Sequence, residues 1–343
     1  MHPLRSTLAF VVLPVALAAA PWSSDLGFHP PDDSKVTREY SIQFDFELGD
    51  LTMIADGQDM SEMVPGDFEV TGELRLQVDD HFVRSGGGRA LELIRTYAEI
   101  VANMEAAGES QDFEGADKLE GKTVRFLWNE DESDYDVAFH ESEGDESALQ
   151  AISADMDLSV LLPGKAVEVG DVWTVPAEEI GSVLMFGGDL DDQESGDEMG
   201  ALMKRELGPQ FDAMLADFKI SCEYRGEREE GGVRVGVIGL TLAGEGELDL
   251  EPVILAAMEV QELPMEIDLS FNSALLEMSF EGKGELLWNL KNGMLHAFDM
   301  GADMEFAADI NVAMDAGGES HEMQAEVEVL GRGTWKVRTP GGD

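Results

Sequence analysis

The sequence predicts a mainly β (α+β) protein: a large curved antiparallel sheet or half-barrel, with a long C-terminal meander and a few helices packed on one face. The clearest observation is segment 300–314, in which every even position is apolar or small and most odd positions are polar or acidic. Successive side chains of a strand point to opposite faces, so this segment predicts a strand that is dry on one side and acidic on the other. Its even positions are Met300, Ala302, Met304, Phe306, Ala308, Ile310, Val312 and Met314.

Two neighbouring segments, 278–290 and 323–337, alternate in the same way. Asn292-Gly293 lies between the first of them and segment 300–314, and this dipeptide favours a tight hairpin turn because both residues tolerate positive φ. Three long strands in a meander are therefore expected. Strands of this length are uncommon in flat sheets, which is why the prediction is a curved one.

The N-terminal half shows the same alternation at 36–48 and 68–78, and an acidic turn at 129–134 predicts a hairpin between 122–128 and 135–140. Segment 89–107 is ambiguous. Its apolar residues fit helical spacing, so we predict a helix, with a strand followed by a short helix as the alternative. Those residues are Leu91, Ile94, Ala98, Val101 and Met104.

The middle of the chain is mixed. We expect a short helix at 145–155, a helix starting at Pro176, an acidic loop at 187–196 and a helix at 197–216. Strands then follow at 218–224, 233–250 and 265–271. The prediction is one large β-rich domain over 35–338, with possible halves 35–175 and 217–338 joined by the helical and acidic segment 176–216.

The N-terminus has the pattern of a signal peptide, with Arg5 in a short basic region, an apolar stretch from Leu8 and small residues at its end. Cleavage after Ala18 is favoured over cleavage after Ala20, because the latter would place Pro21 next to the cut. The prediction is a signal peptide at 1–18, a linker at 19–34 and an exported protein of the periplasm, cell surface or extracellular space. With Cys222 as its only cysteine, the chain has no lipidation site near the cut, and no later apolar run predicts a membrane helix.

The charge is unusual: 72 acidic residues stand against 22 Lys and Arg, a formal net charge of -50. A hydrophobic content of 43% still predicts a folded core. Nucleic acids and anionic membrane surfaces are excluded as partners because their binding requires clustered positive charge. Cationic partners, divalent ions or a salt-adapted solvated surface remain compatible with this composition.

No catalytic motif is present, so the sequence predicts no enzymatic activity; a hydrolase is a minor alternative. The acidic loop offers oxygen ligands for calcium, the one cofactor under consideration, at Asp189, Asp191, Asp192, Glu194 and Asp197. Its spacing does not match an EF-hand, and the six His residues show no metal-binding spacing. Cys222 shares strand parity with Ile220 and Tyr224, which predicts a buried packing residue.

Segment 161–174 reads LLPGKAVEVGDVWT. It resembles the L-P-x-K-x-V-x-V-G-D-x-W motif of exported, planctomycete-type bacterial proteins of unknown function. This resemblance implies a shape similar to the lipoprotein-carrier and lipoprotein-localisation folds, and it brings no catalytic residues. Physically, the motif predicts a strand end, turns at Pro163-Gly164 and Gly170-Asp171, and a buried Trp173.

The functional hypothesis is a non-enzymatic envelope or extracellular protein that binds an apolar ligand, such as a lipid or lipopeptide, or a partner protein within the curved sheet. The alternative is an acidic structural module with calcium-dependent or salt-adapted behaviour. Methionine is abundant, with 18 residues; core filling is the usual explanation, and the alternative is an apolar cavity whose methionine side chains re-pack around varied ligands. The predicted apolar face or cavity comprises Met300, Met304, Phe306, Ile310, Met314, Trp288, Phe280 and Trp335.

Overall fold

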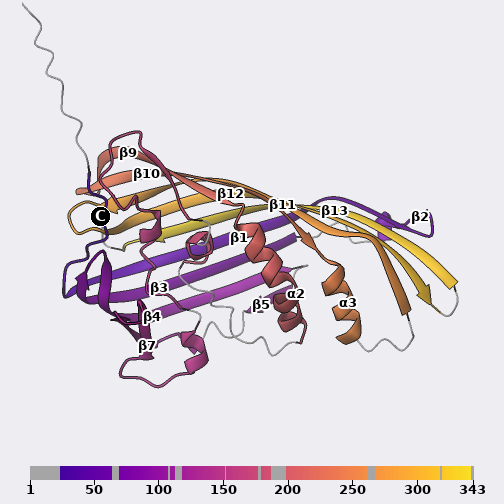
Figure 1. The fold of residues 1–343 in the computed structure, drawn as a ribbon, viewed down its shortest axis with the longest axis horizontal. Coiled ribbons are helices and arrows are strands. Elements are labelled where there is room, and N and C mark those ends of the chain that lie inside the picture. Colours follow the sequence, from indigo (N-terminus) through magenta and orange to yellow (C-terminus); the bar gives the residue numbers. More distant parts are fainter. Residues whose placement is uncertain are drawn as a thin grey trace, which may run out of the picture.

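The computed structural model describes residues 24–63, 69–106, 109–112, 118–150, 152–176, 179–186, 198–260, 267–316 and 319–340. Antiparallel strands dominate it, and the longest ones run side by side along the molecule (Figure 1). The strands of the first half are β1 (Ser34–Ala55), β2 (Gln58–Asp59), β3 (Glu69–Gly86), β4 (Arg89–Ala106), β5 (Glu109–Asp112), β6 (Thr123–Asn129) and β7 (Asp134–Phe139). Those of the second half are β8 (Val172–Thr174), β9 (Lys219–Glu230), β10 (Val233–Asp249), β11 (Ile267–Asn289), β12 (Met294–Ala316) and β13 (Glu319–Arg338).

All these strands join one curved 13-stranded sheet, with the order β7-β6-β4-β3-β1-β13-β12-β11-β10-β9-β8; β2 pairs with β1, and β5 with β4. The first and last long strands are neighbours, because β1 pairs with β13 from Glu39↔Arg338 to Ala55↔Met323. Within the described ranges no pairing joins β7 to β8, so the sheet is unclosed. The mainly β, curved antiparallel architecture is thus as the alternation predicted.

The C-terminal meander is confirmed. β11 and β12 pair from Ile267↔Ala316 to Asn289↔Met294, and β12 and β13 pair from Ala297↔Arg338 to Ala316↔Glu319. Met300 and Met304 are only 1% and 8% exposed, whereas Asp303 between them is exposed. We call the side of Met300 the inner face and the side of Asp303 the outer face.

The turn between β11 and β12 differs in detail from the expected two-residue hairpin. It spans four residues, 290–293, and only Gly293, with φ of 62°, takes a positive φ there. Asn289 Oδ1 accepts hydrogen bonds from the backbone N–H groups of Lys291 and Asn292. Asn289, the residue before the turn, therefore stabilises it.

The helix predicted at 89–107 is wrong, because this segment is strand β4. The register between β3 and β4 shifts at Ala98: Val78 pairs with Tyr97, but Gln77 pairs with Glu99. This bulge moves the inner-face positions from odd to even numbers, so that Leu93, Tyr97 and Ile100 follow one another at helix-like intervals. The residues that suggested a helix lie on both faces of this strand, since Ile94 and Val101 stand opposite His81 and Arg75 on the outer face and Met104 stands opposite Gly72 on the inner face.

Helices are few. The helix expected at 197–216 is α2 (Glu198–Leu215), the helix after Pro176 is the five-residue α1 (Ile180–Leu184), and 145–155 holds only a 3-10 turn, Glu146–Leu149. Further 3-10 turns are Ser61–Met63 and Ser159–Leu161. Helix α3 (Glu251–Val260) was not predicted, although Glu251-Pro252 carries the acid and the Pro typical of a helix start.

The motif segment 161–174 makes both expected turns, with Gly164 at φ 62° and Gly170 at φ 93°. It does not begin with a strand end, since Ser159–Leu161 forms a 3-10 turn. Trp173 lies in β8 and is half-buried rather than buried; its indole Nε1 donates to the carbonyl of Leu161 at 3.0 Å. This hydrogen bond links Leu161, at the start of the motif, to β8 at its end.

Candidate apolar binding surface

Along the central strands the inner face changes from fully buried to mostly half-buried, although Val312 of β12 and Ala274 of β11 are again only 6% and 4% exposed. On β12, Phe298 is 0% exposed and Met300 1%, whereas Phe306 and Ile310 are half-buried. On β13 the series ends at Met323, which is 40% exposed. We call the end near Phe298 proximal and the end near Met323 distal.

Segments outside the long strands fill the proximal end. Residues 24–33, expected to be linker, place Leu26 and Phe28 in the core, where Phe28 packs against Phe82 and Trp288. Phe186, just after α1, packs edge-on against Tyr40 and Phe298. The proximal inner face is therefore occupied by the chain itself.

A buried ionic network fixes a further segment, residues 153–157, to the sheet. Asp80 on β3 accepts hydrogen bonds from Arg38 Nη1 at 3.1 Å and from Arg95 Nε at 2.7 Å, and Arg38 Nη2 also contacts Asp157. All four side chains are at most 2% exposed. Arg95 further donates to the carbonyls of Ser153 and Ala154 at 2.9 and 3.2 Å. Segment 153–157 is thus held by charged groups from β1, β3 and β4.

Burial raises the pKa of two acidic groups at this network, Asp157 and Tyr40. Desolvation raises the pKa of Asp157 from 3.8 to about 6, against the opposing effect of the adjacent Arg38. Desolvation also raises the pKa of Tyr40, whose hydroxyl donates to the carbonyl of Met156 at 2.9 Å. The alternation of apolar and polar residues did not predict this network. A signal was available, because Arg38, Asp80 and Arg95 occupy inner-face positions of otherwise apolar strands.

A row of phenylalanines crosses the inner face between the two ends. Ring centroids are 5.1 Å apart for Phe218 and Phe280, 5.8 Å for Phe280 and Phe306, 5.6 Å for Phe306 and Phe46, and 5.4 Å for Phe46 and Phe44. These rings come from β1, β11, β12 and the residue before β9. We call this set the phenylalanine row.

Glycines on the intervening strands make room for the row. A Cβ on Gly331 of β13 would lie 2.3 Å from Phe46 Cδ1, one on Gly244 of β10 2.3 Å from Phe218 Cγ, and one on Gly72 of β3 1.9 Å from Phe44 Cζ. Each ring therefore lies over the backbone of a neighbouring strand. These three glycines of the inner face thus accommodate aromatic side chains.

Beyond the row lies a half-buried apolar region, which we call the distal surface. It spans the inner-face positions of β1, β13, β12 and β11, which the pairing places side by side. Its residues are Leu48, Leu51, Met53, Val329, Val327, Ala325, Ala308, Ile310, Met314 and Leu276. Helix α2 contacts β10, where Met214 lies over Gly246, and α3 contacts α2 and β11.

The predicted apolar residues thus divide into three groups. Trp288, Met300 and Trp335 belong to the filled proximal core, and Met304 lies at its border. Phe280 and Phe306 belong to the phenylalanine row. Ile310 and Met314 lie on the distal surface. Sequence parity placed all eight on one face but carried no information on which of them the chain covers.

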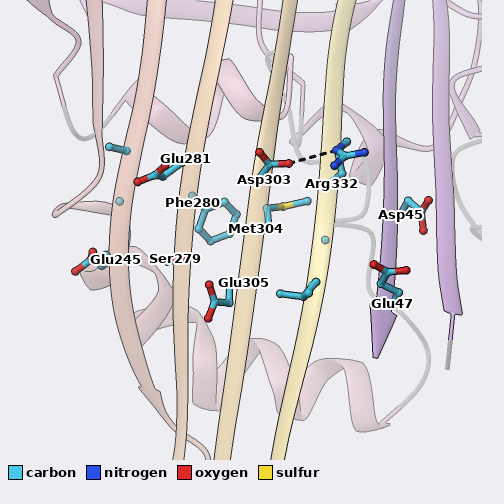
Figure 2. Close-up of a pocket in the computed structure, with 14 residues that line it drawn as sticks. Asp45, Glu47, Glu245, Ser279, Phe280, Glu281, Asp303, Met304, Glu305 and Arg332 are labelled. Atoms are coloured by element: carbon cyan, nitrogen blue, oxygen red, sulfur yellow. Dashed lines mark hydrogen bonds and ion pairs between the residues drawn. The ribbon is translucent and has the colours of Figure 1, made fainter. Parts of the chain in front are cut away.

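The outer face carries a shallow acidic groove of about 680 Å³ across β1, β13, β12, β11 and β10 (Figure 2). Carboxylates of Asp45, Glu47, Glu245, Glu281, Asp303 and Glu305 line it, together with Arg332. Arg332 Nε contacts Asp303 Oδ1 at 3.2 Å, a pair that is largely exposed and therefore contributes little to stability. Like charges also stand directly opposite each other, as in Glu281↔Asp303 and Glu247↔Glu277.

Metal and nucleophile candidates give no assembled site in the described part of the chain, where no group of three or more His, Cys, Asp or Glu is placed to hold a metal ion. The proposed calcium ligands Asp189, Asp191, Asp192 and Glu194, with Asp197, lie outside the described residues. Cys222 is 0% exposed, as its parity predicted, and burial raises the pKa of its thiol to about 12.

No protein-family model matches this chain, and neither does any curated protein. Solved structures with some similarity are an outer membrane channel of Pseudomonas putida F1 (8% identity, 91% of this chain and 97% of that chain, TM-score 0.16) and OprB of Pseudomonas putida (8%, 89% and 94%, 0.18). A porin mutant of Rh. blastica gives 6% identity, 89% and 100% coverage and a TM-score of 0.16. Scores this low carry no argument about fold or function. Among the helices in the described ranges, none is both long and apolar enough to span a bilayer.

Proposed function

We propose that this chain is a non-enzymatic exported protein of the cell envelope or extracellular space, and that its distal surface binds an apolar ligand such as a lipid. In this proposal α2 and α3 cover part of the inner face on the β10 side, and the remainder receives the ligand. The observation that carries it is the half-buried apolar surface running across the inner face of β1, β13, β12 and β11.

Two physical arguments support the proposal. Folded monomers rarely leave a contiguous apolar region of several strands in contact with water unless it binds something. The distal surface also contains Met53, Met314 and the neighbouring Met323, whose unbranched side chains adapt to ligands of varied shape. The phenylalanine row separates this surface from the solid proximal core, so a ligand would rest on a preformed aromatic floor at one end.

Two adjacent residues of β13 provide a matched test. Ala325 faces inward opposite Met53 and Ile310, and Gln324 faces outward next to Glu326. Ala325→Glu adds one negative charge to the distal surface, whereas Gln324→Glu adds the same charge to the outer face. We expect the first variant to bind an uncharged apolar dye, N-phenyl-1-naphthylamine, at least tenfold more weakly than wild type, because a carboxylate on an apolar surface must be desolvated when the ligand covers it.

Gln324→Glu should bind the dye as wild type does. Native mass spectrometry of the protein purified from its source should show an adduct of lipid mass, which organic extraction removes. Wild-type protein that binds no dye and shows a ligand-free mass would contradict the proposal. Equal weakening by both variants would place the binding elsewhere than the inner face.

A further inference from the structure

The methionines of this chain differ sharply in burial. Several fill the core and are at most 8% exposed: Met156, Met214, Met278, Met294, Met300 and Met304. At the distal end, by contrast, Met53 and Met60 are half-buried, and Met323 and Met63 are 40% and 73% exposed. Core filling does not explain these four residues. Leu would provide similar apolar area at an exposed position without a sulfur that oxidants attack.

The strand pairing brings three of these thioethers together on the inner face. β1 and β2 form a hairpin at the distal end of the sheet (Figure 1), and its register continues to Met53 and Met60, where the Met60 N–H donates to the Met53 carbonyl at 2.7 Å. Met60 therefore stands opposite Met53 and points to the same side. Met53 also pairs with Ala325, which makes Met323 its diagonal neighbour on β13. Opposite and diagonal Cβ atoms lie about 5 Å and about 7–8 Å apart, within reach of long side chains.

A short 3-10 turn adds a fourth thioether. The Met63 N–H donates to the Met60 carbonyl at 2.9 Å. Side chains three residues apart eclipse each other in such a turn, so Met63 lies on the same side as Met60. Ser61 ties the turn to both strands, because its hydroxyl accepts from the Met53 N–H at 2.9 Å and its own N–H donates to Asp59 Oδ1 at 3.0 Å. Met60 and Met63 are thus held beside Met53.

Neutral sulfur donors gathered in this way suit a soft monovalent cation. Thioethers select Cu(I), and Ag(I) has the same charge and softness, whereas Ca²⁺ and Mg²⁺ take oxygen ligands. The three rotatable bonds of each Met side chain let the sulfur atoms converge on one ion without a shift of the strands. Two of the four side chains are largely exposed, so an ion can reach them from solvent.

We propose that the distal end of the sheet binds Cu(I) through a methionine site made by the thioethers of Met53, Met60, Met63 and Met323. His321, whose Nδ1 contacts Asp56 Oδ2 at 2.8 Å, is not part of this site. The inference goes beyond the proposed function and does not depend on it, because it uses sulfur as a metal ligand rather than the apolar area of the distal surface.

The first test uses Ag(I), which undergoes no redox change in chloride-free buffer. The parent protein carries Cys222→Ala, because a thiolate also binds soft ions. Calorimetry should show Ag(I) binding, and the ¹³C-labelled methyl signals of the four methionines of the site should shift in the NMR spectrum. The signal of Met185, which is 44% exposed but lies at the end of α1, should not shift.

Three substitutions remove sulfur and keep an apolar side chain: Met53→Leu, Met60→Leu and Met323→Leu. We expect each to weaken Ag(I) binding about tenfold or more, and the triple variant to lose it, because Leu offers no ligand atom. Met185→Leu is the matched control and should bind Ag(I) as the parent does. Competition with bicinchoninate under reducing, oxygen-free conditions should give the same order for Cu(I).

The outcomes separate the methionine site from the proposed function. The triple variant should still bind N-phenyl-1-naphthylamine, since Leu preserves the apolar surface; a parent protein that binds Ag(I) but no dye would keep the site and end the lipid proposal. A parent that binds no Ag(I), or a triple variant that binds it as tightly as the parent, would overturn the inference. Should the triple variant not fold, the methyl shifts of the parent decide, and shifts confined to other methionines would equally overturn it.

Discussion

Replacing Gly331 with Ala tests how the inner face is built. The added Cβ would lie 2.3 Å from Phe46 Cδ1 and 2.4 Å from Phe46 Cε1, where an ordinary carbon contact is about 3.5–4.0 Å. The ring must therefore move by more than an ångström. Neighbouring rings restrict that movement, since Phe44 and Phe306 have centroids 5.4 and 5.6 Å from Phe46. We expect a loss of about 1–3 kcal/mol in the free energy of unfolding, the usual cost of overpacking.

Gly301 on β12 provides the matched control. A Cβ there meets nothing closer than the Gly333 carbonyl oxygen at 3.9 Å, so Gly301→Ala should be neutral or stabilising by up to about 1 kcal/mol through the entropy of the unfolded chain. Urea denaturation followed by tryptophan fluorescence gives both values, and equal m-values would show that the unfolding reaction is unchanged.

A double-mutant cycle isolates the contact between the methyl group and the ring. Phe46→Ala removes the ring, so Gly331→Ala in that background should cost nothing, and the coupling free energy should equal most of the single-mutant loss. If Gly331→Ala is as stable as Gly301→Ala, or if its cost persists without Phe46, the aromatic side chain does not lie over this glycine. The phenylalanine row would then not lie where the structure has it, and the aromatic border of the distal surface would be wrong as well.

Three further outcomes are expected. Between pH 4 and 7, wild type should lose about 2 kcal/mol of stability relative to Asp157→Asn in paired urea titrations, because a carboxyl with a pKa of about 6 when folded and 3.8 when unfolded binds its proton more tightly in the native state; parallel pH curves would contradict this. Glu281→Gln should stabilise the protein by about 0.2–1 kcal/mol at low salt and by nothing in 1 M NaCl, since it relieves repulsion by the opposed Asp303; a loss of stability at low salt would refute it. Cys222 should react with a thiol reagent only upon unfolding, and rapid reaction of native protein would contradict its burial.

The regular parts of this fold follow from the sequence because a single period runs through them. Along β12 the alternation continues without interruption, so parity alone assigns Met304 to the inner face and Asp303 to the outer face. Where a bulge changes parity, as at Ala98 in β4, the same rule gives the wrong element. Local patterns cannot distinguish such a strand from a helix, because the position of the bulge becomes visible only in the pairing of β4 with β3.

The candidate site was less predictable than the sheet. Parity grouped Trp288 with Ile310 on one face, but burial depends on where distant segments pack. Trp288 packs against Phe28 and donates its indole N–H to the carbonyl of Gly27, whereas Ile310 stays half-buried. The ionic network was missed for the same reason. Asp157 belongs to no periodic element, and its partner Arg38 lies 119 residues away in the chain.

The buried ionic network and the half-buried distal surface lie at opposite ends of the same inner face. A sheet with strands of more than twenty residues presents more inner face than the remaining described segments cover. At the proximal end the ionic network of Arg38, Asp80, Arg95 and Asp157 fixes the position of segment 153–157. Buried ionic groups of this kind favour one arrangement over others even when they add little net stability. At the distal end α2 contacts β10 and α3 contacts β11, while inner-face residues of β1 and β13 stay half-buried. A protein that needed only a stable sheet would be expected to shorten these strands or to make their inner positions polar. This chain keeps them long and apolar, and that surface is where we propose that an apolar ligand binds.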